Sequence, residues 1–242
     1  MDTSAKLEDN IDSVNVAAAK ADSSPNRVVQ SVAFLTSLSD PTLDEVIWDR
    51  ACGRPDPPEL PPSAWDESRV QIFIDVIQYE ADGVAIRLRS SSTRLLSKAV
   101  EKEPIEEAFA VAELCFLTAR AGAYDAIPAL TVLVEREHQR QTPVSGRETL
   151  YSGALESLGG LLANLDTEHR HLLNRNRHRS LFVGALDTPG CVLPALTVLI
   201  GLKLGTEAEF RSMLPEWFAR NEAALRASLT ISFGSKSAAF AD

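Results

Sequence analysis

Two Glu-x-x-His motifs are the first candidates for chemistry in this sequence: Glu135 with His138, and Glu168 with His171. Di-iron carboxylate bundles use two such motifs, each with one more glutamate from a neighbouring helix, and Glu113 and Glu156 occur in that order. Metal sites of this kind lie in the middle of a bundle, whereas His138 ends one expected helix and Glu168 begins another. We therefore expect no metal site.

Nucleophilic catalysis has no recognisable motif here. The sequence contains neither a Gly-x-Ser-x-Gly elbow nor a phosphate-cradling glycine loop. Cys52, Cys115 and Cys191 are separated by more than sixty residues, which excludes a zinc-ligand spacing and favours small buried side chains. We expect no catalytic and no cofactor-binding residues, and no cofactor. The alternative is an enzyme whose site assembles from distant positions.

A basic run is the second candidate for chemistry. Residues 169–179 contain four Arg and three His, the only concentrated positive charge on an acidic chain. One interpretation is a solvated helix face or loop that pairs with acidic neighbours. The other is a binding surface for phosphate, nucleic acid or an acidic partner, because Arg offers bidentate donors. The candidate partner-binding residues are Arg170, His171, Arg175, Arg177, His178 and Arg179.

The composition narrows the class of protein that must position these residues. The 242 residues are 45% hydrophobic and 24% charged, ordinary values for a globular protein, with a net charge of -10. Nucleic acid and anionic membranes are bound by clustered Lys and Arg, so this charge favours a protein partner and disfavours both. The longest apolar run, 192–204, is shorter than the roughly 20 residues of a membrane span. Residues 1–25 show no targeting segment, and a cytoplasmic location follows by default.

A six-residue phrase, Pro-Ala-Leu-Thr-Val-Leu, occurs twice, at 128–133 and at 194–199, which is 66 residues apart. Proline near the start of an apolar stretch suits the first turn of a helix, where its missing N–H would have no partner. The residues that follow are apolar on most sides, which is typical of a buried helix. We therefore predict that Leu130, Leu133, Leu196 and Leu199 are buried.

Helical spacing of apolar residues extends over most of the chain, and it predicts an all-α fold with less than about a tenth of residues in strands. Residues 84–89 alternate and could form a strand, but the neighbouring segments favour a helix. Gly122 is expected to end a helix, and Asp40 with Pro41 to begin one. The predicted helices are 28–39, 40–51, 70–81, 84–100, 105–121, 126–137, 147–165, 167–186, 192–200 and 207–231.

The predicted organisation is one helical domain, 26–232, between two tails. Residues 1–25 are acidic and polar and are expected to be a flexible tail, and 233–242 a C-terminal tail. Five prolines between 53 and 63 indicate an extended connection inside the domain, or a docking peptide for an aromatic groove. Thr206 and Glu209 form a capping box, Pro215 interrupts or restarts the helix that follows, and apolar residues from Trp217 to Ile231 would close the last apolar face.

Residues 108–137 resemble a HEAT or HEAT-like repeat. Ala112-Glu113-Leu114 lies in a first helix, Gly122-Ala123-Tyr124-Asp125 forms the turn, and Ala126-Ile127-Pro128-Ala129-Leu130 begins a second helix. The resemblance covers these thirty residues well and about 84–230 loosely. It implies stacked antiparallel helical hairpins, an α-solenoid or a related array, that present an extended binding surface.

The distance between the two phrases departs from a strict repeat. If outer and inner helices alternate, an odd number of helices should separate two equivalent phrases, yet only the helices at 147–165 and 167–186 do so. Either the second of these is broken near Asn174-Arg175-Asn176 into two short helices, which we prefer, or the phrases occupy different layers.

The function expected from the sequence is a protein-binding helical scaffold or adaptor without catalytic activity of its own. Stacked hairpins give a long surface groove and no deep preformed pocket, which suits a protein partner. The alternative is a nucleic-acid or phosphate-binding helical-repeat module that uses the basic run, 169–179.

Overall fold

The computed structural model describes residues 24–60, 68–79, 83–102, 105, 107–140, 147–188 and 190–205. Within these ranges the regular structure is helical and contains no strand, which confirms the predicted all-α class for the part described. The finer expectation of stacked HEAT-like hairpins stays a prediction. No helix in these ranges combines the length and apolar content that crossing a membrane requires. The predicted tail 1–25, apart from its last two residues, and all residues after 205 lie outside the described residues.

The chain divides into two compact units, residues 1–92 and 93–242. The boundary falls inside α5 (Val84–Glu101), a helix that crosses it without interruption. The prediction placed both units in one domain, 26–232, and no Pro, Gly or charge run in the sequence marks residue 92.

Unit 1 is built from α2 (Ser24–Ser37), α3 (Asp40–Ala51), α4 (Gln71–Tyr79) and the first part of α5, with α4 packed on α2. The start of α3 agrees with the prediction from Asp40 and Pro41, although the N-cap is Ser39. The hydroxyl of Ser39 accepts a hydrogen bond from the backbone N–H of Thr42 at 3.4 Å. This bond satisfies one of the N–H groups that the first turn of a helix leaves without a partner.

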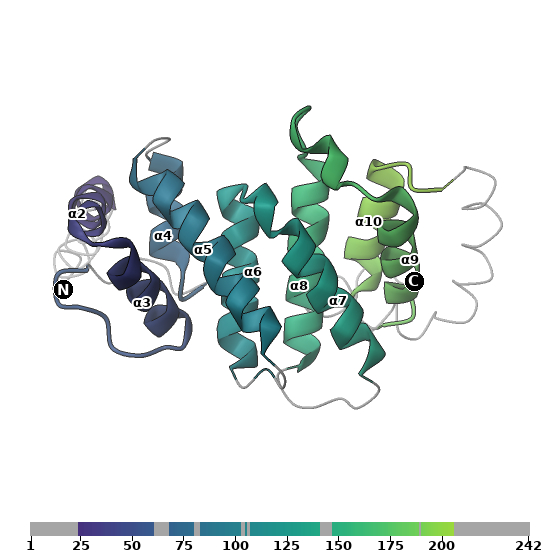
Figure 1. The fold of residues 1–242 in the computed structure, drawn as a ribbon, viewed down its shortest axis with the longest axis horizontal. Helices are drawn as coiled ribbons and strands as arrows, with labels where there is room; N and C mark the ends of the chain where they lie inside the picture. Colours follow the sequence, from purple (N-terminus) through teal and green to yellow (C-terminus); the bar gives the residue numbers. More distant parts are fainter. Residues whose placement is uncertain are drawn as a thin grey trace, which may run out of the picture. The chain divides into compact units, whose positions relative to one another are not determined.

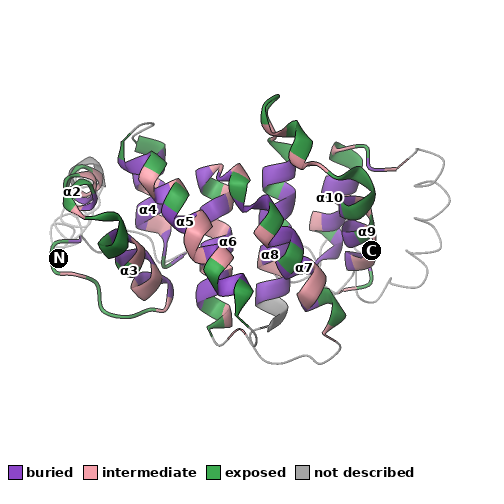
Figure 2. Ribbon diagram, viewed as in Figure 1, coloured by how far each residue is buried: buried purple, intermediate pink, exposed green. Residues whose placement is uncertain are grey.

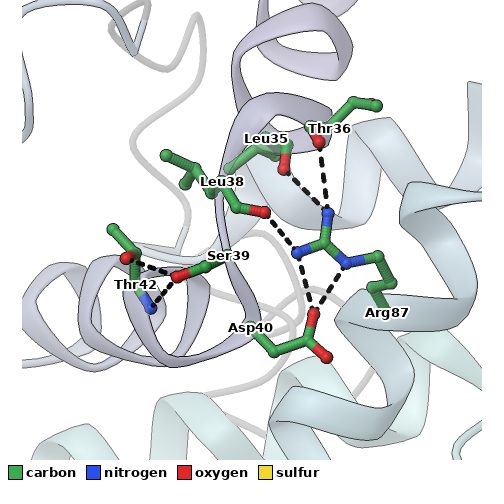
Figure 3. Close-up of polar contacts among 7 residues, drawn as sticks. All are labelled: Leu35, Thr36, Leu38, Ser39, Asp40, Thr42 and Arg87. Carbon is green, nitrogen blue, oxygen red and sulfur yellow. Dashed lines mark hydrogen bonds and ion pairs between the residues drawn. The ribbon is translucent and has the colours of Figure 1, made fainter.

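Arg87 of α5 holds the corner between α2 and α3 (Figure 3). Its guanidinium donates hydrogen bonds to the carbonyl oxygens of Leu35 at 3.3 Å, Thr36 at 3.4 Å and Leu38 at 2.6 Å. The same group donates to Oδ1 of Asp40 at 2.8 Å. Leu35 and Thr36 belong to the last turn of α2 and Leu38 follows it, in a region where a helix leaves carbonyl groups without their usual intrahelical N–H partners. One side chain therefore caps α2 and fixes the start of α3.

The described part of the proline-rich connection, 53–60, has turns and no regular helix. It is anchored at its start, because Arg50 forms an ion pair with Asp56 and donates to the carbonyl oxygen of Arg69 at 2.5 Å. It is anchored again at Leu60, which is buried. These contacts favour a structural connection over a docking peptide for the described part of this segment. Residues 61–67 lie outside the described residues.

Unit 2 contains the rest of α5 and two layers of helices (Figure 1). α6 (Ala108–Ala121), α8 (Arg147–Ala163) and α10 (Val192–Gly201) form one layer, in which α8 contacts both of the others. α7 (Ile127–Gln139) and α9 (Arg175–Ala185) lie against this layer, since α7 contacts α8 and α9 contacts α10. Buried residues line the sides on which these helices face one another (Figure 2).

Local sequence signals set most helix ends in unit 2 and in α5. Gly122 follows α6 with φ of 64°, the left-handed conformation that glycine adopts without strain. Residues 124–126 then form a short 3-10 turn, and Pro128 lies in the first turn of α7, as predicted. Residues 84–89 belong to α5, so the helical interpretation of their alternating pattern is confirmed.

The two copies of the repeated phrase bury different faces. In α7 the buried positions include Leu130, Thr131 and Leu133, whereas in α10 they include Ala195, Val198 and Leu199. The prediction is therefore confirmed for Leu130, Leu133 and Leu199 and is wrong for Leu196, which is only half-buried. The reason is that α7 and α10 belong to different layers, so their neighbours lie on different sides.

The region 167–186 is broken, as the sequence analysis preferred, but it does not form two full helices. A four-residue 3-10 turn, η2 (His169–Leu172), is followed by α9, whose N-cap is Asn174. The Oδ1 atom of Asn174 accepts from the backbone N–H of Arg177 at 3.0 Å. Two α-helices, α8 and α9, thus separate the two phrases, which is why the phrases lie in different layers.

The difference between the two phrases gives a paired prediction. Leu130→Ala should lower the free energy of unfolding by about 2–5 kcal/mol, because Leu130 is 0% exposed and its truncation leaves a cavity. Leu196→Ala should cost clearly less, because part of that side chain already contacts solvent. Urea denaturation of both variants checks this. Equal losses would show that the two phrases are equally buried.

Candidate functional site

The basic run lies on η2 and the first turns of α9. Arg170 and His171 are exposed on η2, and Nδ1 of His171 is bonded to the carbonyl oxygen of Glu168 at 2.9 Å. This contact caps the turn within its own segment. The structure therefore leaves Arg170 as an exposed cation of the run and His171 as an exposed imidazole.

The other arginines of the run are engaged within the protein. Arg177 forms a bidentate ion pair with Glu135 of α7, with both N–O distances at 2.6 Å. Arg177 lowers the pKa of Glu135, mainly through these hydrogen bonds. Arg175 donates to the backbone carbonyl of Lys203, just after α10. Arg179 is half-buried and also has a partner. These contacts stabilise α9 against its neighbours and reduce the charge available to a ligand.

His178 lies in the interior, with only 2% of the residue exposed. Its Nε2 is 3.3 Å from Oγ1 of Thr131 in α7, and the Thr131 hydroxyl is 2.7 Å from the carbonyl oxygen of Ile127. Because the hydroxyl has a single hydrogen, a bond to Ile127 makes Nε2 of His178 the donor in the other contact. Nδ1 is then the unprotonated nitrogen, and it is buried without a partner. Burial, followed by the charge of Arg177, lowers the pKa of His178.

The two Glu-x-x-His motifs do not come together. Glu135 is occupied by Arg177, and Glu168 and His171 are exposed on η2. His138 stacks on Tyr151 of α8, with Nδ1 3.2 Å from the tyrosine hydroxyl. Among the described residues, no group of three His, Cys, Asp or Glu side chains could hold a metal ion.

Buried side chains around Tyr151 could suggest a reactive cluster that the sequence did not indicate. Burial raises the pKa of Tyr151 to about 12, and burial also raises the pKa of the Cys115 thiol. A raised pKa keeps both groups protonated near neutral pH, the opposite of what a nucleophile or a general base requires. Cys191 is likewise buried and Cys52 is half-buried. Tyr151, Cys115 and Cys191 belong to the packing of unit 2, and Cys52 lies in unit 1.

A groove that the sequence analysis did not anticipate lies between α8 and α10. Its volume is about 340 Å³, and its walls are mostly apolar. α8 contributes Gly160 and Ala163 to it, and α10 contributes Leu193, Thr197 and Gly201. Gly160 and Ala163 on one wall and Gly201 on the other have little or no side chain, which leaves space between the two helices.

A second groove, of about 300 Å³, lies on the other side of α8, against α6. Phe116 and Arg120 of α6 form one wall, and the Arg120 guanidinium lies over the Phe116 ring at 5.2 Å from its centroid. Glu156 and Gly160 line both grooves. The Glu156 residue is exposed, yet its carboxyl group is partly surrounded by apolar atoms, and this desolvation raises its pKa.

The neighbouring glycines of α8 have different roles. A Cβ atom at Gly159 would stand 2.5 Å from Cγ2 of Val198, so glycine is required for the contact between α8 and α10. A Cβ atom at Gly160 would meet nothing within 4 Å, because Gly160 faces the grooves. Close packing of α8 against α10 therefore depends on Gly159 and not on Gly160.

Comparison of the chain with protein-family models, with curated proteins and with solved structures finds no match. The resemblance of residues 108–137 to a HEAT-like repeat therefore stays a prediction, and the function has to be argued from the surfaces described above.

The buried His178 predicts a pH dependence of stability. Its pKa is lowered in the folded state, so as pH falls through about 6.5 the unfolded chain takes up a proton that the folded chain does not. This proton uptake lowers the free energy of unfolding by at most about 1.4 kcal/mol per pH unit. His178→Gln should lose less stability than the wild type between about pH 7.5 and about pH 5.5 in urea denaturation. The exposed His171→Gln is the control. The same loss in all three proteins would contradict this assignment.

The two glycines predict opposite effects of one substitution. Gly159→Ala should destabilise by about 1–3 kcal/mol, because the stiff Val198 side chain or α10 itself must move. Gly160→Ala should stabilise by about 0.5–1 kcal/mol, since alanine is the better helix former and has free space there. Melting temperatures of the two variants check the prediction. If both variants raised the melting temperature, or both lowered it, Gly159 would not be the glycine of α8 that faces α10.

Proposed function

We propose that this chain is a protein-binding helical scaffold, without catalytic activity of its own, that receives a segment of its partner on the exposed face of α8. The observation that carries the proposal is the pair of grooves that flank α8 and share Glu156 and Gly160. A helix or extended segment laid along this face would occupy both grooves at once. The alternation of helices between two layers in unit 2 supports a HEAT-like repeat as the framework.

The grooves suit a polypeptide better than a small molecule. Each is open to solvent, whereas pockets for small ligands enclose most of the ligand surface. Glycine and alanine on the exposed face of α8 allow a partner backbone to approach closely. Helix-in-groove recognition uses apolar anchors at helical spacing, and Leu193 with Pro194 gives such anchors an apolar wall.

The charge of the surface indicates the chemistry of the partner. Glu156 lies where the two grooves meet, and its carboxylate loses further water contacts when a partner covers it. A Lys or Arg of the partner would replace those water contacts with an ion pair to the Glu156 carboxylate. The net charge of -10 also favours a basic partner, because it increases the rate at which the protein encounters basic segments. We therefore expect an amphipathic partner segment with a basic residue facing Glu156.

The alternative function, nucleic-acid or phosphate binding through residues 169–179, has less support. Arg177 is paired with Glu135, Arg175 with a backbone carbonyl, and His178 is buried. Arg170 and His171 are exposed on one short turn, whereas Arg175 and Arg177 are exposed but already bonded within the protein. Binding to phosphate backbones depends on several cations acting together, so these contacts reduce the affinity available.

The proposed function predicts that a larger side chain at position 160 blocks binding without unfolding the protein. Gly160→Leu should fill both grooves, and its Cβ atom meets nothing within 4 Å. Ser180→Leu, at an exposed position of α9, is the matched control. The wild type and Ser180→Leu should both capture native partners. Gly160→Leu should raise the Kd for them by at least about tenfold, which corresponds to about 1.4 kcal/mol of binding free energy. Glu156→Lys should weaken the binding of a basic partner in the same assay.

Two further arms decide between the proposed function and its alternative. Capture is repeated after nuclease treatment, and with Arg170, Arg175, Arg177 and Arg179 all replaced by Ala. Binding that survives both treatments but is lost with Gly160→Leu supports the proposal. Binding that falls with nuclease and with the fourfold replacement, and is indifferent to Gly160→Leu, assigns the function to the basic run.

A further inference from the structure

α10 exposes an apolar face beside the groove, and Leu193 lies where the two meet. The helix has no charged residue from Val192 to Gly201. Its buried side, with Ala195, Val198 and Leu199, meets α8 and α9. Ile200 and Leu193, however, are each 57% exposed. A helix that is apolar on all sides is stable in water only when every side is covered.

These exposed residues share one face of α10. Leu193, Leu196 and Ile200 are spaced at i, i+3 and i+7, so they form a single stripe along the helix. Thr197 and Gly201, which line the groove, lie farther round on the same exposed side. Leu196 and Ile200 are not part of the groove wall. Leu193 is itself part of the groove wall. The part of the stripe formed by Leu196 and Ile200 therefore adjoins the proposed binding site without belonging to it, and an inference about this part does not rest on the proposed function.

The end of α10 turns the chain back sharply. The backbone N–H of Leu204 donates to the carbonyl oxygen of Leu199 at 2.9 Å, and that of Lys203 donates to Ile200 at 3.1 Å. Lys203 has a φ of 49°, and Leu204 is buried. These features define a Schellman-type helix end, in which a left-handed residue and an apolar contact reverse the chain. The left-handed conformation is unusual for lysine, and the burial of Leu204 helps to hold it.

The residues that follow have the sequence of a covering helix. Gly205 alone separates Leu204 from the capping box of Thr206 and Glu209. Large apolar residues then recur three or four positions apart at Phe210, Met213, Leu214, Trp217 and Phe218, and Leu225 follows Phe218 after seven positions, or two helical turns. Such spacing predicts one continuous apolar stripe, with Pro215 at the start of its second part.

We infer that residues 207–231 of the same chain cover the apolar face formed by Leu196 and Ile200. The short connection keeps this segment beside α10 at a high effective concentration, so it competes well against any second molecule. Its apolar stripe matches the apolar face of α10. The chain has already reversed its direction at Lys203 and Leu204, immediately before this segment. The other candidate occupant is a second copy of the chain, docked through the same face.

Photo-crosslinking in the full-length protein tests which occupant is present. p-Benzoylphenylalanine in place of Ile200 should form an adduct with residues 207–231 inside the same molecule, identified by mass spectrometry of the monomer. p-Benzoylphenylalanine in place of Val132, which is exposed on α7, is the control and should form no adduct with residues 207–231. Adducts between two molecules, or none with 207–231, would overturn the inference.

Limited proteolysis supplies a second readout that does not depend on a crosslinker. Ile200→Asp should raise the rate of trypsin cleavage at Arg211, Arg220 and Arg226 by at least several-fold, because the covering segment loses its apolar contact. Ile86→Asp, at a similarly exposed isoleucine of α5, should leave these rates unchanged. Light scattering of the wild type should give the mass of one chain. A dimer that Ile200→Asp dissociates, with cleavage unchanged, would assign the face to a second copy.

Discussion

The contact between Gly159 of α8 and Val198 of α10 is the constraint on which the candidate binding surface depends. α8 packs against α6, α7 and α10, and it can approach α10 so closely only because position 159 has no side chain. The face of α8 that remains has Glu156 and Gly160, whose neighbours on either side are the walls of α6 and α10. Small residues on a helix between two others leave a hollow on each side. The grooves are therefore a consequence of how tightly α8 is packed on its other faces.

Helix positions in this protein follow from local signals, and they could be predicted for that reason. Gly122 ends α6 in the left-handed conformation, Pro128 lies in the first turn of α7, and Asn174 caps α9. Each signal acts within a few residues, through backbone sterics or a single hydrogen bond. The corner at Arg87 is different. Its partners lie 47 to 52 positions away in the sequence, and no periodicity of residues 84–89 indicates them.

The faces that the helices bury could not be read from the sequence, and the repeated phrase shows why. The same six residues bury Leu130 in α7 and leave Leu196 half-exposed in α10, because burial depends on the layer that each helix occupies. The basic run shows the same limit for charge. The concentration of positive charge in residues 169–179 could be seen in the sequence. The partner of Arg177 could not, because Glu135 is 42 positions away. His178 lies within the run and yet faces Thr131 in the interior.

The two exposed surfaces of α10 differ in chemistry, and this difference indicates what each is for. Thr197 and Gly201, on the groove side, have small side chains, so they expose little apolar area to water. Leu196 and Ile200, on the other side, are large and apolar, and exposing them is unfavourable at all times. A surface that binds and releases a partner has to be stable in both states, whereas a surface covered by its own chain does not. The two sides of α10 therefore differ in the cost of leaving them in contact with water.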